Sequence, residues 1–180
     1  MLFKRNSLPT EPAQLLRAVT SERAVAWINY PSVVVEDQNP AELVKDAWII
    51  ATAKYLVLIK GDTKQSWPWH LVDRAAWDPQ TNQLMVLLVE SPAPLVITIT
   101  DKTPIKLLTF LRERVDHSVV MSESVVITMT QTARVAVRRT DTDGLIIQTV
   151  YDPGVNPNAA AVTRKVAPVI DRLRDMSGAA

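Results

Sequence analysis

Cysteine is absent from the 180-residue sequence, and glycine and histidine are scarce. A chain without cysteine forms no disulfide, offers no thiolate to a metal and has no cysteine nucleophile, and it suits a reducing compartment. The four glycines stand apart from one another, so they build no glycine-rich loop of the kind that cradles phosphate. The sequence therefore lacks the motifs of several large enzyme classes.

Charge of neither sign is in excess. The chain has 20 Lys and Arg against 19 Asp and Glu, which gives a formal net charge of +1. Proteins dedicated to nucleic acid usually carry a clear basic excess. We therefore expect no nucleic-acid partner.

Long hydrophobic runs are also missing. The most apolar region, residues 84–100, is interrupted by Glu90, Pro92 and Pro94, whereas a span of roughly 20 apolar residues is needed to cross a bilayer. The charged N-terminal residues are not followed by the apolar segment of a secretory signal. We expect a cytoplasmic protein with no transmembrane segment.

What the sequence does contain is a concentration of tryptophan. Trp67, Trp69 and Trp77 all lie within residues 65–89. Trp67, Trp69 and Leu71 fall on alternate positions, which is the period of a half-buried strand. Large aromatic side chains in this pattern indicate a hydrophobic core, and the alternative is an aromatic recognition face.

The alternation breaks near Asp73 and resumes at Trp77. Residues 78–82 are rich in turn formers and residues 84–89 are almost wholly apolar, so the stretch predicts strand, turn and strand. Pro68 cannot donate a hydrogen bond to a central ladder, and the first strand is therefore predicted to lie at a sheet edge or to be broken there.

Other strands are predicted where apolar residues alternate or run between turn formers. These segments are residues 23–30, 47–52, 55–60, 95–100, 119–129, 133–140 and 145–151. A long connection is predicted over residues 31–46, and the turn formers of residues 141–144 predict a hairpin between the last two strands.

Three helices are predicted. Thr10 caps a short first helix that would lie across an open end of the main fold. The second covers residues 103–117, with Pro104 at its first position and apolar residues at helical spacing on one side. Asn156 caps the third, which Pro168 is expected to kink or divide.

This order of elements is the plan of the pleckstrin-homology-like barrel, in which a helix after the last strand closes one corner of two packed sheets. The motifs more narrowly resemble an actinobacterial protein family of unknown function. The matching segments are AVAW at residues 24–27, WIIAT at 48–52, WPWHLVDRAAWD at 67–78, LRERVDHSVV at 111–120, ARVAVRR at 133–139 and VYDPGVNP at 150–157.

The resemblance implies an α+β protein with a pleckstrin-homology-like β-sandwich capped by an amphipathic helix. We predict an N-terminal segment with a short helix over residues 1–21 and the pleckstrin-homology-like core over residues 22–118. A β-hairpin and helix over residues 119–180 are expected to pack on the core as one compact unit. The alternative is two small domains divided near Ser118.

Many pleckstrin-homology domains bind phosphoinositides through basic residues in the loop that joins their first two strands. The corresponding loop here carries four acidic residues, Glu36, Asp37, Glu42 and Asp46, against the single base Lys45. Such a loop repels an anionic headgroup.

The best basic cluster consists of Arg134, Arg138 and Arg139. On a strand, Arg134 and Arg138 share one face. One interpretation is a strip that binds an anionic ligand or a protein, joined by Arg112 and Arg114. The other is a solvated face paired with acidic neighbours.

Catalytic candidates are few. A metal or proton-transfer site would need His70 and His117 to meet, and the alternative for both is a structural or solvent-facing role. Asp73, Asp78 and Glu90 are the candidates for a catalytic group of carboxylates. The alternative is that Asp73 and Asp78 are turn and end residues that flank a strand. We expect no enzyme, no cofactor and no metal site.

The sequence favours a non-enzymatic binding or scaffolding module that recognises a protein partner. The strand broken at Pro68 and the hairpin at residues 141–144 are candidate edges for a peptide, or for a second copy in a homodimer. The alternative function is a sensor of a small anionic ligand or lipid that uses the arginines of residues 134–139. A hydrolase or transferase would need a histidine beside a carboxylate in a pocket.

Overall fold

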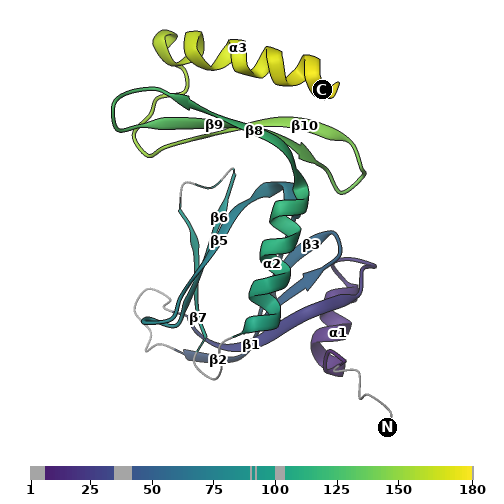
Figure 1. Ribbon diagram of the computed structural model, residues 1–180. Helices are drawn as coiled ribbons and strands as arrows, with labels where there is room; N and C mark the ends of the chain where they lie inside the picture. The colour runs from purple at the N-terminus through teal and green to yellow at the C-terminus, as the bar shows by residue number, and fades with distance from the viewer. Residues whose placement is uncertain (1–6, 35–41, 90, 92, 100–103, 180) are drawn as a thin grey trace.

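The computed structural model describes residues 7–34, 42–89, 91, 93–99 and 104–179, with side chains omitted for residues 31–34 and 42–46. It shows an α+β protein with three antiparallel sheets and three α-helices (Figure 1). None of the described helices is long and apolar enough to span a membrane.

The first two sheets follow one another along the chain. β1 (Ala24–Val34), β2 (Glu42–Thr52), β3 (Tyr55–Lys60) and β4 (Thr63–Pro68) form a four-stranded meander, and β5 (Val72–Asp78), β6 (Gln83–Leu88) and β7 (Leu95–Thr98) form a three-stranded one. α2 (Ile105–Ser118) follows the last strand and packs against β1, β2 and β5. Four strands, three strands and a closing helix are the plan expected of a pleckstrin-homology-like core, so the predicted fold class is confirmed.

Apolar side chains from both sheets and from α2 fill the interior of this core. Alternation along the strands and the spacing of four along α2 bring them to one side of each element. The buried set includes Ala26, Tyr30, Ile49, Leu56, Trp69, Val72, Leu84, Val86, Ile97, Leu107, Leu111 and Val115. Trp67 and Trp77 are half-buried against the same cluster, as the core interpretation of the tryptophans requires.

The tryptophan stretch is broken at Pro68, as one of the two predictions for that proline has it, and the alternation of Trp67, Trp69 and Leu71 does not continue as a strand. β4 ends at Pro68, a 3₁₀ turn over Trp69–Leu71 follows, and β5 then begins in the second sheet. The Trp69 backbone N–H donates to the Lys54 carbonyl at 3.2 Å, and its indole N–H donates to the Thr52 carbonyl at 3.2 Å. The break therefore falls at Pro68 and not near Asp73, and among the described strands β4 pairs with β3 alone, as an edge strand containing proline should.

The connection between β1 and β2 is shorter than predicted. The two strands stay paired as far as Ser32 with Val44 and Val34 with Glu42, so only residues 35–41 lie between them. Those seven residues, which include Glu36 and Asp37, lie outside the described part of the chain.

α1 (Thr10–Arg17) lies on the outer face of the first sheet and does not cross an open end, so that prediction is wrong. Leu16 is buried against Ile50, Val57 and Ile59, whose side chains point away from the main core. Thr10 is the first helical residue, Pro9 precedes it, and no side chain caps the helix.

β8 (Val119–Val126), β9 (Thr132–Arg139) and β10 (Leu145–Tyr151) form the third sheet with β9 in the middle, and α3 (Ala160–Ser177) covers one of its faces (Figure 1). A second hydrophobic cluster lies between them, including Val135, Val137, Val166 and Leu173. We call β8 to α3 the extension and the preceding β1 to α2 the core.

The predicted start of the last helix is wrong, and its predicted division at Pro168 is not observed. It begins at Ala160 and not beside Asn156, because the Asn156 side chain instead accepts from the Asn158 N–H at 3.0 Å in a local turn. It also continues through Pro168 as one helix.

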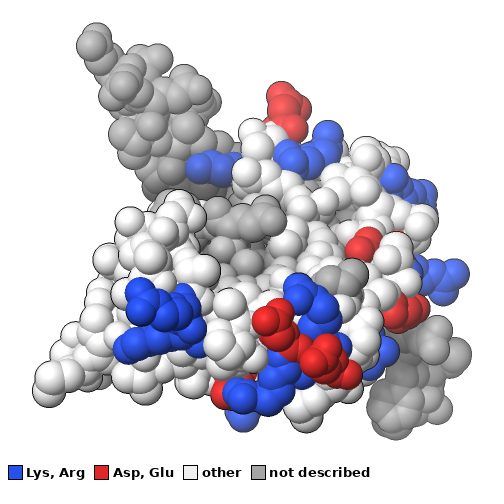
Figure 2. Space-filling view, turned by 90° about the horizontal axis from the view of Figure 1, so that it is seen from above, with Lys and Arg blue, Asp and Glu red and all other residues white. Residues whose placement is uncertain are grey.

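From the α3 side, basic and acidic side chains are interspersed over the surface (Figure 2).

Candidate functional site

The predicted arginines lie on β9 with the expected alternation but in different surroundings. Val135 and Val137 face α3, while Arg134 and Arg138 face the core. Arg138 is only 1% exposed, so these residues do not form a solvated strip. Both faces of β9 are covered, one by α3 and the other by the core. The sequence pattern had suggested that the face carrying Arg134 and Arg138 would be exposed to solvent.

Arg134 and Arg138 converge on Asp73, the second residue of β5. Arg134 pairs with the Asp73 carboxylate. Arg138 lies 3.4 Å from that carboxylate and also donates to the Val72 carbonyl at 3.1 Å and to the Ser118 hydroxyl at 2.7 Å. We call these four side chains, Asp73, Arg134, Arg138 and Ser118, the Asp73 network.

Desolvation governs the electrostatics of this network. Burial, followed by the neighbouring charge of Arg134, lowers the pKa of Arg138 to about 10, which leaves the guanidinium charged at neutral pH. Asp73 is only 6% exposed, and a carboxylate so deeply buried needs charged partners. The network thus joins the extension to the core, while a ligand-binding role for Arg134 and Arg138 stays a prediction.

The catalytic candidates are dispersed. Asp78 accepts from the Gln80 N–H and from the Thr81 hydroxyl, both at 2.8 Å, so it stabilises the β5–β6 turn and these bonds lower its pKa. Asp73 lies at the other end of β5 inside its network, and Glu90 is outside the described residues. Across the part of the chain that the structure describes, no three His, Asp or Glu side chains gather as metal ligands.

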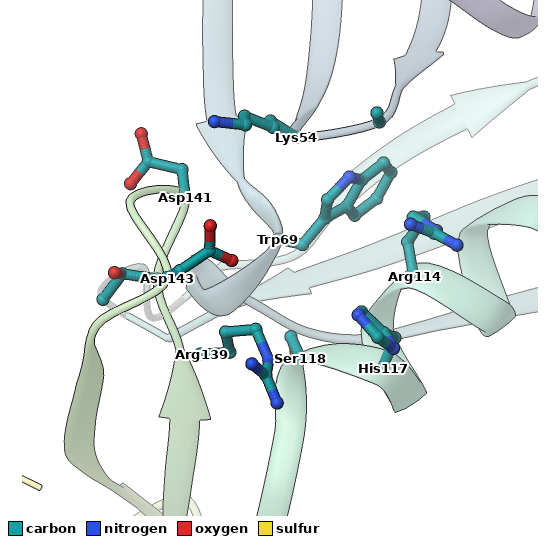
Figure 3. A pocket seen from close by; sticks show the side chains of 10 residues that line it. Lys54, Trp69, Arg114, His117, Ser118, Arg139, Asp141 and Asp143 are labelled. Atoms are coloured by element: carbon teal, nitrogen blue, oxygen red, sulfur yellow. The ribbon is translucent and has the colours of Figure 1, made fainter.

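A pocket of about 210 Å³ lies where the core and the extension meet (Figure 3). We call it the junction pocket. The core contributes Lys54 from the β2–β3 turn, Trp69 from the 3₁₀ turn, and Arg114 and His117 from the end of α2. The extension contributes the end of β9 and the β9–β10 hairpin.

The extension side of the junction pocket contains Arg139, Asp141 and Asp143. Asp141 accepts from the Tyr55 hydroxyl at 2.7 Å. That hydrogen bond holds the pKa of the Asp141 carboxyl below its usual value and raises the pKa of the Tyr55 phenol. The hairpin was predicted from its turn formers, but the contact of its tip with Tyr55 has no local signal in the sequence.

Arg114 has an unusual environment in this pocket. Its guanidinium lies over the Phe110 ring, 5.1 Å from the ring centre, and its Nε is buried without a hydrogen-bond partner among the described residues. His117, one turn later, also lines the pocket, whereas His70 does not. The histidine shares the pocket with Asp141 and Asp143 but lies across from Asp143 and not beside it (Figure 3). Of the three predicted arginines, only Arg139 lines this pocket.

A second concave site, about 450 Å³ in volume, lies between β5 and α2. We call it the β5–α2 groove. Trp77, Leu108, Leu111 and Val115 contribute its apolar wall, and β5 pairs with β6 alone among the described strands, which leaves its other edge unpaired. The sequence carries no local signal for this groove, because its shape depends on how α2 lies against β5.

Comparisons with known proteins add little to this geometry. Neither a protein-family model nor a curated protein matches the sequence. A crystal structure of a DUF1696 family protein with a pleckstrin-homology domain from Shewanella loihica PV-4 is similar over 58% of this chain and 94% of that chain, with a TM-score of 0.41 and 16% identity. The fold class therefore rests on the strand order and on the place of α2.

Proposed function

We propose that the protein is a non-enzymatic binding module that takes an extended segment of a partner protein onto the free edge of β5. The observation that carries this proposal is the position of that edge, beside the β5–α2 groove. An extended segment satisfies the backbone groups of an open strand edge, while its alternate side chains enter a neighbouring groove.

The groove also indicates the chemistry of the partner segment. Its wall is apolar, and the exposed arginines Arg74 and Arg112 stand at its rim, with side chains 70% and 85% exposed. Asp116 offsets Arg112 in part at 3.7 Å. The segment that fits has apolar side chains on one face and acidic residues at its flanks.

Selection from a random peptide library tests the proposal. Peptides that bind the full chain are expected to be apolar and acidic, and in amide NMR spectra they should shift resonances of residues 74–78 and of the adjacent face of α2. The paired substitution Arg74→Glu and Arg112→Glu should weaken binding at least about tenfold, since each rim charge then repels the peptide.

The paired substitution Arg17→Glu and Arg164→Glu is the matched control, because both arginines are exposed, on α1 and α3, and neither lines the groove. It changes the net charge without altering the rim, so affinity should stay at the value of the unchanged protein. Selected peptides that shift other surfaces, or that bind the paired variant as tightly, would overturn the assignment. Shifts on β5 that depend on protein concentration without peptide would instead identify a second copy of the chain as the occupant.

We also propose that the protein belongs to the actinobacterial family that its motifs resemble and that it is located in the cytoplasm. The alternative function, a sensor of a small anionic ligand or lipid through residues 134–139, is less well supported, because Arg138 is buried and Arg134 is paired with Asp73. A surface strip for a lipid headgroup needs several exposed cations together.

A further inference from the structure

We propose that the junction pocket is a second binding site, which takes a small zwitterion of the free amino acid class. The ligand carboxylate would lie on the side of Arg114, on α2, and its ammonium group would lie on the side of Asp143, on the β9–β10 hairpin. Arg139 lines the pocket from the end of β9 and would be a second partner of the carboxylate. This inference does not depend on the peptide-binding proposal, because the two sites share no lining residue.

Two arginines without an ion pair line the pocket. Arg114 lines it from α2 and Arg139 from the end of β9, and within the described residues neither forms an ion pair. The buried Nε of Arg114 lacks an acceptor among the described residues. A carboxylate is the acceptor that guanidinium groups bind best, in a planar geometry.

Two carboxylates line the pocket from the β9–β10 hairpin. Asp141 already accepts from Tyr55 and is flanked by Lys54, and both hold its pKa down. Asp143 has no such partner among the described residues, and in Figure 3 its carboxylate is directed toward Trp69 from the hairpin side, across from Arg114 and His117. It is therefore the group left to receive an ammonium.

The size of the pocket restricts the ligand further. At about 210 Å³ it lies below the range of roughly 300–1,000 Å³ that is usual for sites of drug-sized ligands. Trp69, which is 6% exposed, offers a limited apolar surface to a short side chain. A small amino acid with opposite charges close together satisfies both the size and the two charged sides.

The pocket also couples the ligand to the junction. Core residues form one part of its wall and extension residues form the other, so a bound zwitterion bridges the two. Because a ligand that binds only the native state stabilises it by mass action, the ligand should raise the melting temperature of the whole chain.

The test uses the full chain and the 20 common L-amino acids as probes. At least one is expected to raise the melting temperature and to bind in calorimetry with a Kd below about 1 mM. For each binder, the compound without its amino group and the compound without its carboxyl group should bind at least about tenfold more weakly, because each leaves one side of the pocket unpaired.

Variants locate the site. Arg139→Met and Asp143→Asn should each weaken binding about tenfold, since both side chains are exposed and neither change disturbs the fold. Arg164→Met is the control, because Arg164 is exposed on α3 and lines neither the junction pocket nor the β5–α2 groove, and it should leave affinity unchanged. Arg114→Met should also weaken binding. Because this variant loses the contact of Arg114 with Phe110, its melting temperature is also measured without ligand, as a check that it folds.

Three results would overturn the inference. One is that none of the 20 amino acids binds. Another is that the analogue without the amino group binds as well as the parent, which would make the pocket a plain anion site. The last is that Arg139→Met and Asp143→Asn bind like the unchanged protein. Peptide binding at the β5–α2 groove would stand or fall separately in each case.

Discussion

Asp73 is the residue on which the contact between core and extension depends most. It is buried, it pairs with Arg134 and Arg138, and Arg138 reaches it from 65 positions along the chain. Replacing a whole set of buried ion pairs by well-packed apolar side chains often costs a protein little stability. Removing one partner is different, because it leaves an uncompensated charge in the interior. The network therefore makes each single substitution costly.

Arg138→Met is expected to lower the free energy of unfolding by about 3 kcal/mol, at the low end of the range for a broken buried pair because Arg134 still compensates Asp73. Urea unfolding followed by circular dichroism measures the change. Arg74→Met is the control: Arg74 lies 4.0 Å from the same carboxylate but is 70% exposed, so its loss should cost no more than about 0.5 kcal/mol. Equal effects of the two substitutions would show that burial of the Arg138 charge is unimportant.

Tyr55 and Asp141 give a prediction about pH. The Tyr55 hydroxyl keeps the folded-state pKa of Asp141 below the usual value, so the hydrogen bond stabilises the fold above that value and is lost as pH falls through the lower one. Tyr55→Phe should therefore raise the Asp141 pKa toward normal, as measured by carboxyl NMR titration. The stability difference between the two proteins should be constant near neutral pH and shrink in acid. An Asp141 titration that Tyr55→Phe leaves unmoved would contradict the assignment.

Among the elements, the best predicted were those with local signals. α2 shows apolar residues at helical spacing behind Pro104, and the 141–144 turn formers mark the β9–β10 hairpin, where Asp143 adopts a left-handed φ of 62°. The 3₁₀ turn at Trp69 was missed because Trp67, Trp69 and Leu71 imitate a strand. The bonds that bend the chain there come from residues 52 and 54.

The sites were less predictable than the elements for the same reason. The sequence shows a basic cluster but gives no indication that Asp73 is its partner, because the pairing follows from how the third sheet sits on the core. The β5–α2 groove likewise arises from the packing of two elements separated along the chain. Of the cluster Arg134, Arg138 and Arg139, only Arg139 lines the junction pocket, where Arg114 and His117, also singled out from the sequence, line it too.

Pro168 gives the prediction at the scale of a helix. It lies inside α3 and is exposed, and a proline there removes one backbone hydrogen bond and crowds the preceding turn, at a cost of about 3 kcal/mol relative to alanine. Pro168→Ala should raise the free energy of unfolding by about 1–3 kcal/mol in urea denaturation. Pro157→Ala, before the helix begins, is the control and should change little. A loss of stability in Pro168→Ala would mean that α3 needs the local shape that proline imposes in order to cover the third sheet.

At the scale of the whole molecule, two hydrophobic clusters meet through a polar junction. The core cluster lies between the first two sheets and α2, and the extension cluster lies between the third sheet and α3. The Asp73 network and the Tyr55–Asp141 hydrogen bond cross between them. Residues 22–118 and 119–180 form one cooperative unit if these polar contacts couple the unfolding of the two clusters, and two units if each cluster unfolds by itself.

We predict that the two clusters unfold together and that the Asp73 network is the reason. All five tryptophans lie in the first 77 residues, so their fluorescence reports on the core, while the methyl NMR signals of Val162 and Val166 report on the extension. In urea the two transitions should coincide for the unchanged protein, as for a single cooperative unit. Replacing Arg134 and Arg138 together by Met should separate them, with the extension unfolding first, because Asp73 then loses both partners. Separate transitions in the unchanged protein would instead establish two small domains divided near Ser118.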